Sequence, residues 1–166
     1  LLAASKLQAE SMKLTYDDVN LPALVRRSIE RFQMQTARHT LSASFPDDFP
    51  IIRGDSRRLH QVIDNLVSNA IKYSPPGGPI TITGDFNGTT VRISVRDQGI
   101  GLPPDQLERV FERFYRVDNS LTQKAPGTGL GLYLANAVIK AHGGRIWAEN
   151  NPDGGATFRF ILPRGD

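Results

Sequence analysis

Apolar residues recur with the period of an α-helix in three stretches of the chain, which predicts helices over about residues 20–38, 55–73 and 128–142. In each stretch one face is apolar and the other polar, as in helices that cover one side of a core. The apolar faces comprise Leu21, Leu24, Val25, Ile29 and Phe32 in the first helix, Leu59, Val62, Ile63, Leu66, Val67 and Ala70 in the second, and Leu130, Leu134, Val138 and Ala141 in the third.

The ends of these helices carry residues that start and stop helices. Asn20 is placed to cap the first helix, and Asp55 or Ser56 to cap the second. The run PPGG at residues 75–78 ends the second helix, and the double glycine at 143–144 ends the third.

Alternation of apolar and polar residues predicts strands between and after the helices. Alternating runs around Ile80 and Val91 flank Asn87-Gly88, which is typical of a hairpin. Further strands are expected near residues 41–45, 50–53, 145–149 and 156–162. Helices mixed with adjacent antiparallel strands indicate a two-layer α/β sandwich, with a mixed, mostly antiparallel sheet covered on one face by helices, and not a doubly wound parallel sheet.

Two segments fall outside this pattern. Residues 1–14 place Leu7 and Leu14 one heptad apart in helix-favouring company and look like the end of something longer. Residues 98–127 are rich in Gly, Pro and polar side chains, with one short helical patch at about 105–113, and a connection of this length is usually functional or mobile. The length of the chain, 166 residues, fits one compact domain.

Composition excludes several classes of function. The chain has no cysteine, so it can form neither disulfides nor thiolate metal sites, which is compatible with the cytoplasm. The net charge of +3 and the scattered basic pairs, without interleaved aromatics, do not favour nucleic-acid binding. No apolar run approaches the ~20 residues of a membrane span, so we expect a soluble segment without direct membrane contact.

A polar stripe follows one side of the second helix. Asn65, Asn69 and Lys72 stand at positions i, i+4 and i+7, so they line up along the helix. An Asn carbonyl is a hard oxygen ligand for Mg²⁺, and a lysine can neutralise phosphate. The plain alternative is an ordinary solvated helix face.

Asp97 closes the strand around Val95 and is followed by Gln98, Gly99, Ile100 and Gly101. A carboxylate there can accept a hydrogen bond from an exocyclic amine, and glycines let a flat ring approach the backbone. The alternative is an Asp-Gly turn without a ligand.

A glycine-rich loop directly precedes the third helix, with Gly127, Thr128, Gly129, Leu130 and Gly131 in succession. Such a loop aims free N–H groups and the positive end of the helix dipole at an anion, and it can hold phosphate. It is neither a Rossmann fingerprint nor a P-loop, because the glycine spacing differs and no Gly-Lys-Ser/Thr follows. A plain helix-entry turn is the alternative.

In order and spacing, these motifs resemble the boxes of sensor histidine kinases. Residues 65–75 (NLVSNAIKYSP) resemble the N box, and residues 97–101 (DQGIG) resemble the first glycine box. Residues 111–116 (FERFYR) are similar to the F box. Residues 127–132 (GTGLGL), running on to residues 142–147 (HGGRIW), resemble the second glycine box and its following strand. The match covers about residues 20–163 in four ordered motifs.

The resemblance implies the Bergerat ATP-binding fold shared with gyrase, the ninety-kilodalton heat-shock chaperone and MutL. It implies ATP and Mg²⁺ as cofactors, with Asp97 on the adenine amine, Asn69 on the metal and Asn65 in support. Around the base, the resemblance implies contacts from Gly99, Ile100 and Gly101, and Tyr73 would line the nucleotide site. Lys72 and Arg116 would contact the phosphates. The loop that would wrap the phosphates comprises Gly127, Thr128, Gly129, Leu130, Gly131 and Leu132. Residues 115–126 would form a lid, with Phe111 and Phe114 packed at its base or simply in the core.

The resemblance also implies partners. His39, His60 and His142 lack the acidic neighbour of the family's phosphoacceptor box, so we expect them to be structural. Residues 1–15 resemble a remnant of the dimerisation helix or the linker after it, and residues 16–166 resemble the ATP-binding catalytic domain. The phosphoacceptor histidine would lie on the dimerisation domain, and a response-regulator receiver domain would act downstream.

Three other functions share parts of this pattern. An ATPase of the gyrase and MutL type uses a Glu base where this chain has Asn65, which disfavours it. A binding module without catalysis is disfavoured because no box is degraded. Serine kinases that act on anti-sigma antagonists share the fold, but the 111–116 patch and the long lid favour a histidine kinase.

Overall fold

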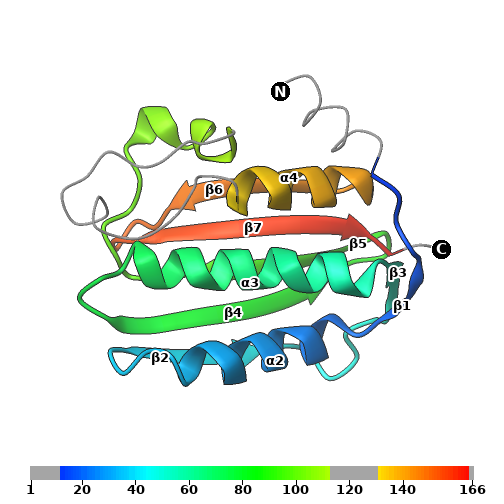
Figure 1. The fold of residues 1–166 in the computed structure, drawn as a ribbon, viewed down its shortest axis with the longest axis horizontal. Helices are drawn as coiled ribbons and strands as arrows, with labels where there is room; N and C mark the ends of the chain where they lie inside the picture. The colour runs from blue at the N-terminus through cyan, green and yellow to red at the C-terminus, as the bar shows by residue number, and fades with distance from the viewer. Residues whose placement is uncertain (1–11, 113–130, 165–166) are drawn as a thin grey trace.

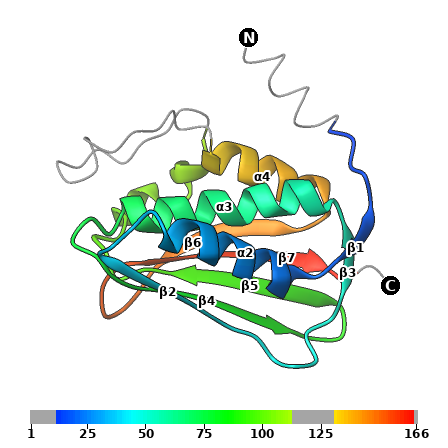
Figure 2. The same ribbon diagram turned by 60° about the horizontal axis from the view of Figure 1, so that its bottom comes forward.

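The computed structural model describes residues 12–112 and 131–164 and forms two layers, a sheet and the helices on one of its faces (Figures 1 and 2). The helices are α2 (Leu21–Gln33), α3 (Ser56–Lys72) and α4 (Gly131–Ala141), with short 3-10 turns η1 (Pro104–Gln106) and η2 (Arg109–Phe111). The strands are β1 (Asp17–Val19), β2 (His39–Ser44), β3 (Ile52–Gly54), β4 (Gly78–Phe86), β5 (Thr90–Arg96), β6 (Arg145–Asn150) and β7 (Ala156–Pro163). None of the helices described is long and apolar enough to cross a bilayer.

The main sheet has the strand order β2-β4-β5-β7-β6. Only β2 and β4 pair in parallel, and the other neighbours are antiparallel. A separate two-stranded sheet pairs β1 with β3. The predicted two-layer α/β sandwich with a mixed, mostly antiparallel sheet is therefore confirmed.

The core lies between the three helices and the inner face of the sheet. The predicted apolar face of α3 is buried throughout, from Leu59 to Ala70. Ile82, Ile93 and Phe160 meet it from β4, β5 and β7, and each is fully buried. Burying one such side chain is worth about 1.5–3 kcal/mol, so this layer fixes the position of α3 on the sheet.

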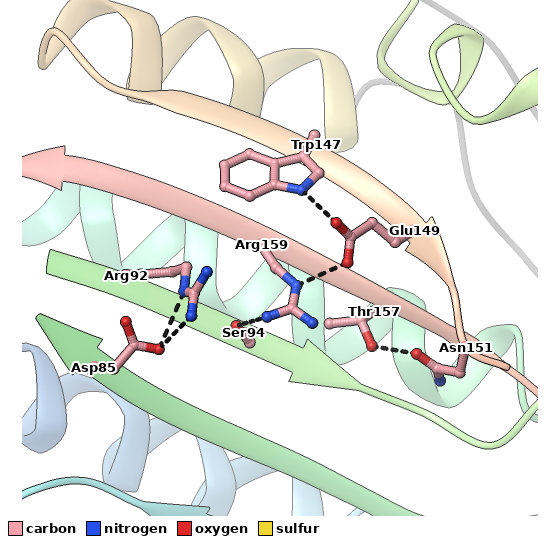
Figure 3. A network of polar contacts seen from close by, with 8 residues as sticks. All are labelled: Asp85, Arg92, Ser94, Trp147, Glu149, Asn151, Thr157 and Arg159. Atoms are coloured by element: carbon pink, nitrogen blue, oxygen red, sulfur yellow. Dashed lines mark hydrogen bonds and ion pairs between the residues drawn. The ribbon is translucent and has the colours of Figure 1, made fainter. Parts of the chain in front are cut away.

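The opposite face of the sheet carries mostly polar side chains (Figure 3). Arg159 on β7 donates to Glu149 on β6 at 3.0 Å and to Ser94 on β5 at 3.3 Å. Asp85 and Arg92 pair across β4 and β5 at 2.9 Å. These contacts join neighbouring strands on a face that no described helix covers.

Caps and turns follow the sequence signals. The side chains of Asn20 and Asp55 accept hydrogen bonds from the N–H groups of Ala23 and Arg58, at 3.0 and 3.1 Å, and so cap α2 and α3. Asn87 turns the hairpin by accepting from the N–H groups of Thr89 and Thr90, both at 2.9 Å.

Several predicted boundaries were wrong. Helix α2 stops at Gln33 and not near residue 38, because the Gln33 side chain donates to His39 O at 2.8 Å and accepts from Leu41 N at 2.9 Å, which supports the turn into β2. The patch at 105–113 forms two 3-10 turns and not one helix. Strand β1, with only three residues, was not predicted.

Other differences are small or fall outside the described residues. Strands β2 and β3 are each displaced by one or two residues from the expected 41–45 and 50–53. The expected start of α4 at Thr128 and most of the helix expected over residues 1–14 lie outside the described residues, and residues 12–16 have no regular structure.

Candidate functional site

The polar stripe of α3 is present and half-buried at Asn65, Asn69 and Lys72. The Nδ2 of Asn65 donates to the carbonyl of Gly131 at 3.1 Å, which joins α3 to the start of α4. Among the described residues, none forms a hydrogen bond with the side chain of Asn69. The amide oxygens of both asparagines thus remain open to a ligand, as a Mg²⁺ site would require.

Asp97 lies directly after β5 and is only 1% exposed. Its Oδ1 accepts from the N–H groups of Gly99 at 2.8 Å and Ala156 at 3.2 Å. Its Oδ2 is buried and has no hydrogen-bond partner within the described part of the chain. Burial raises the pKa of this carboxyl above its ordinary value, although the two N–H donors oppose the rise. A buried acceptor left open in this way suits a donor on a ligand.

The loop after Asp97 is fastened to the end of α3. The N–H of Ile100 donates to the carbonyl of Tyr73, the C-cap residue of α3, at 3.1 Å. A Cβ on residue 99 would lie 1.9 Å from that same carbonyl oxygen, so only glycine allows this approach. The first glycine box is therefore in direct contact with the end of the N box.

Two asparagines at the end of β6 support this loop, and the sequence did not identify them. Asn150 accepts from Leu102 N at 2.8 Å and donates to Leu102 O at 2.7 Å. Asn151 donates to the carbonyl of Asp97 at 3.0 Å and accepts from Thr157 (Figure 3). In the sequence they look like ordinary turn residues. The only signal that could have indicated their role is that two asparagines stand side by side just before the turn at 152–155.

The start of α4 closes the other end of the stripe. A Cβ on Gly131 would lie 3.5 Å from the Asn65 side chain, an ordinary van der Waals distance, so this side chain lies directly beside the start of α4. Leu132 is 6% exposed and belongs to the core, which leaves its backbone as the part that could face a phosphate.

Five expected site residues, Arg116, Gly127, Thr128, Gly129 and Leu130, lie outside the described residues, as do the expected lid at 115–126 and Phe114. Phe111 is described: it packs against the core, with its ring 6.0 Å from that of Phe158 in an edge-on arrangement. The structure thus brings together the described parts of all three motifs, along about 12 Å of α3 between Asn65 and Tyr73.

Two of the three histidines, His39 and His142, have hydrogen-bond partners on both ring nitrogens. His39 is buried, with Nδ1 2.6 Å from the hydroxyl of Thr36 and Nε2 2.7 Å from the carbonyl of Ser74. His142 is buried between Val138 and Asp55. His60 lies on α3 with Nε2 3.6 Å from Asp64.

Residues 54–166 match the family described as histidine kinase-, DNA gyrase B- and HSP90-like ATPases, and the chain belongs to this family. More narrowly, it is similar to the ATP-binding catalytic domains of sensor histidine kinases. It is 40% identical over 98% of its length to sensor histidine kinase WalK of Bacillus subtilis, and 36% identical over 98% to adaptive-response sensory kinase SasA of Rippkaea orientalis. It covers 27% and 42% of those two proteins, so it spans less than half of their length.

Solved structures give the same result. The catalytic domain of histidine kinase ThkA superposes with a TM-score of 0.80 at 30% identity, over 92% of this chain and 99% of that one. Full-length ShkA in complex with AMPPNP superposes with a TM-score of 0.79 at 28% identity, over 94% of this chain and 33% of that one.

Proposed function

We propose that this chain binds ATP and Mg²⁺ between α3, the loop after β5 and the start of α4, and transfers the γ-phosphoryl group to a histidine on a dimerisation domain. Residues 1–15 would be the remnant of that domain's helix or the linker after it, and the described part of this segment, residues 12–15, has no regular structure. The acceptor of the next transfer would be the receiver domain of a response regulator, and the catalytic domain would work in the cytoplasm.

One observation carries this proposal: the Oδ2 of Asp97 is buried without a donor among the described residues, while its Oδ1 accepts two hydrogen bonds. Keeping a carboxylate in this state costs stability unless a ligand supplies a donor. The exocyclic amine of adenine is such a donor. Gly99, Ile100 and Gly101 would shape the base pocket beside it, and Tyr73 would line it.

The phosphate chain would follow the polar stripe towards α4. Asn69 would ligate Mg²⁺ through its side-chain oxygen, Asn65 would support the metal or its water, and Lys72 and Arg116 would contact phosphates. Mg²⁺, when bound, neutralises charge on the phosphate oxygens. Residues 127–132 would wrap the phosphates with backbone N–H groups. In phosphoryl transfer the protein mainly positions the groups and stabilises charge, and these residue types suffice for that.

The nucleophile must come from outside the three histidines of this chain. His39 and His142 are buried and hydrogen-bonded on both ring nitrogens, so neither can meet ATP without local unfolding. His60 is on α3, five residues before Asn65 and close to Asp64. The response regulator proposed downstream is consistent with ThkA, which was crystallised with response regulator TrrA.

A direct test mixes the chain with γ-labelled ATP and Mg²⁺, with and without a separately purified histidine-bearing dimerisation domain of a WalK-type kinase. We expect acid-labile, base-stable label on that domain. Free phosphate without labelled protein would instead indicate an ATPase, and binding without either product would indicate a nucleotide-binding module. Asn65 disfavours the ATPase, because an amide cannot act as the water-activating base.

A further inference from the structure

The chain enters the domain at the point where α3 begins and α4 ends. Strand β1 pairs with β3, whose last residue, Gly54, precedes Asp55 (Figure 2). Just before β1, the N–H of Thr15 donates to Oδ2 of Asp55 at 2.9 Å. The entering segment is therefore bonded directly to the cap of the helix that carries the N box.

Asp55 makes three hydrogen bonds besides the one that its carbonyl accepts from Leu59 N. Its Oδ2 holds Thr15, its Oδ1 caps α3 through Arg58 N, and its own N–H donates to Nε2 of His142 at 3.0 Å. Burial raises the pKa of this carboxyl, but the two N–H donors and the charge of Arg58 outweigh burial and hold the pKa below its ordinary value. The carboxylate is thus charged, and both oxygens are engaged, at neutral pH.

His142 extends the connection to α4. Its Nδ1 lies 2.8 Å from the carbonyl of Val138, and because a carbonyl can only accept, Nδ1 carries the proton and Nε2 is the acceptor for Asp55 N–H. The ring of Tyr16, in the entering segment, contacts the His142 ring edge-on at 6.0 Å. The last turn of α4 and the first turn of α3 are thereby joined to each other and to residues 15–16.

We propose that Asp55 and His142 are positioning residues that couple the entering segment to the nucleotide site. Asp55 and His142 contact the first turn of α3 and the last turn of α4. The residues of the proposed site lie further along the same helices, Asn65 and Asn69 on α3 and Gly131 at the start of α4. A shift of the segment would therefore act on both sides of the site together. This inference rests on the proposed ATP site, and it adds a route by which whatever precedes residue 12 influences that site.

The test uses two variants that break the same bond from opposite ends. Asp55→Ser keeps one oxygen to cap α3 but leaves Thr15 N–H without its acceptor, and Thr15→Pro removes the donor itself. Asp47→Ser, an exposed loop position, is the matched control. The readouts are hydrogen exchange of the β1 amides with and without saturating Mg·AMPPNP, and the dissociation constant of that nucleotide.

If the entering segment affects nucleotide binding, nucleotide binding must affect the entering segment by the same factor. In the wild type we expect the nucleotide to slow exchange at residues 17–19 by about five-fold or more. In each variant that slowing disappears, the dissociation constant rises by the same factor, and the double variant is no worse than either single one. A purely structural bond would leave nucleotide affinity unchanged. Nucleotide binding without any change at β1 in the wild type overturns this inference alone, and no nucleotide binding at all overturns the proposed function with it.

Discussion

The side-chain amide of Asn65 donates to the backbone carbonyl of Gly131 at 3.1 Å, across a gap of 66 positions in sequence. Asn65 belongs to the N box and Gly131 to the second glycine box. The bond therefore joins the two motifs expected to face the phosphates, and it uses only the nitrogen of the amide, which leaves the oxygen for a metal or its water.

Replacing Asn65 with aspartate tests that division of roles. Asn65→Asp keeps the shape but loses the donor, so we expect the free energy of unfolding to fall by about 1 kcal/mol and Mg·ATP to bind more weakly because of the added negative charge near phosphate. Urea denaturation and calorimetric titration measure the two effects. Gln61→Glu, at an exposed position of the same helix, adds the same charge and should change neither quantity appreciably; equal losses in both variants would remove the special role of Asn65.

Replacing Asp97 with asparagine should separate stability from binding. The amide can keep accepting from Gly99 and Ala156, but it places a donor opposite the adenine amine. Loss of a hydrogen bond to a charged group is worth about 1.5–3 kcal/mol, or roughly 10- to 150-fold in the dissociation constant of ATP. Stability should stay equal or rise, since an unpaired buried charge is removed. Asp85→Asn on the exposed face is the control, and unaltered ATP affinity in Asp97→Asn would refute the adenine assignment.

The difference in stability between the wild type and Asp97→Asn should depend on pH. Folding raises the pKa of Asp97 above 3.8, so its protonation stabilises the fold fully below pH 3.8, and this contribution is lost as pH rises through the folded pKa. The wild type should therefore lose stability relative to Asp97→Asn as pH rises through that window. Asp55, whose pKa is lowered, contributes the opposite trend but is common to both proteins and cancels. The test measures the urea midpoints of both proteins from pH 3.5 to 7. A difference between the two midpoints that does not change with pH would contradict the prediction.

Gly99→Ala should damage the base pocket through sterics alone. The new Cβ would meet Tyr73 O at 1.9 Å, so either the end of α3 or the loop must move, at a cost of about 1–3 kcal/mol in stability and with loss of ATP binding. In Gly88→Ala the Cβ has no described atom within 4 Å, and we expect little change. Thermal unfolding and nucleotide titration distinguish them; a fully active Gly99→Ala would mean that the close approach is not needed.

The sequence predicted what depends on local pattern. Helix α3 was predicted within one residue at each end, because a capping residue at 55 or 56 and the PPGG run bound a long amphipathic stretch. The hairpin at Asn87 followed for the same reason. Asp97 was predicted to contact adenine only because the order and spacing of the motifs resemble those of sensor histidine kinases, since an Asp-Gly turn at a strand end is common without a ligand.

What the sequence missed depends on distant partners. The clamp of Asn150 on Leu102 joins residues 48 positions apart, and the bond of Thr15 to Asp55 joins residues 40 apart. Neither has a local signature, since an Asn before a turn and a Thr before a short strand are common. Strand β1 was missed because three residues are too few for a period of two to appear, and its pairing with β3 creates it.

The central claim is that three separate segments bind one nucleotide. The most direct measurement is a titration of isotope-labelled chain with Mg·AMPPNP, in which the backbone amides of Asn69, Gly99 and Gly131 are followed by NMR. All three resonances should move along one binding curve with a single dissociation constant. If any of the three segments stays unperturbed at millimolar nucleotide, or the segments titrate with different constants, they do not form one site.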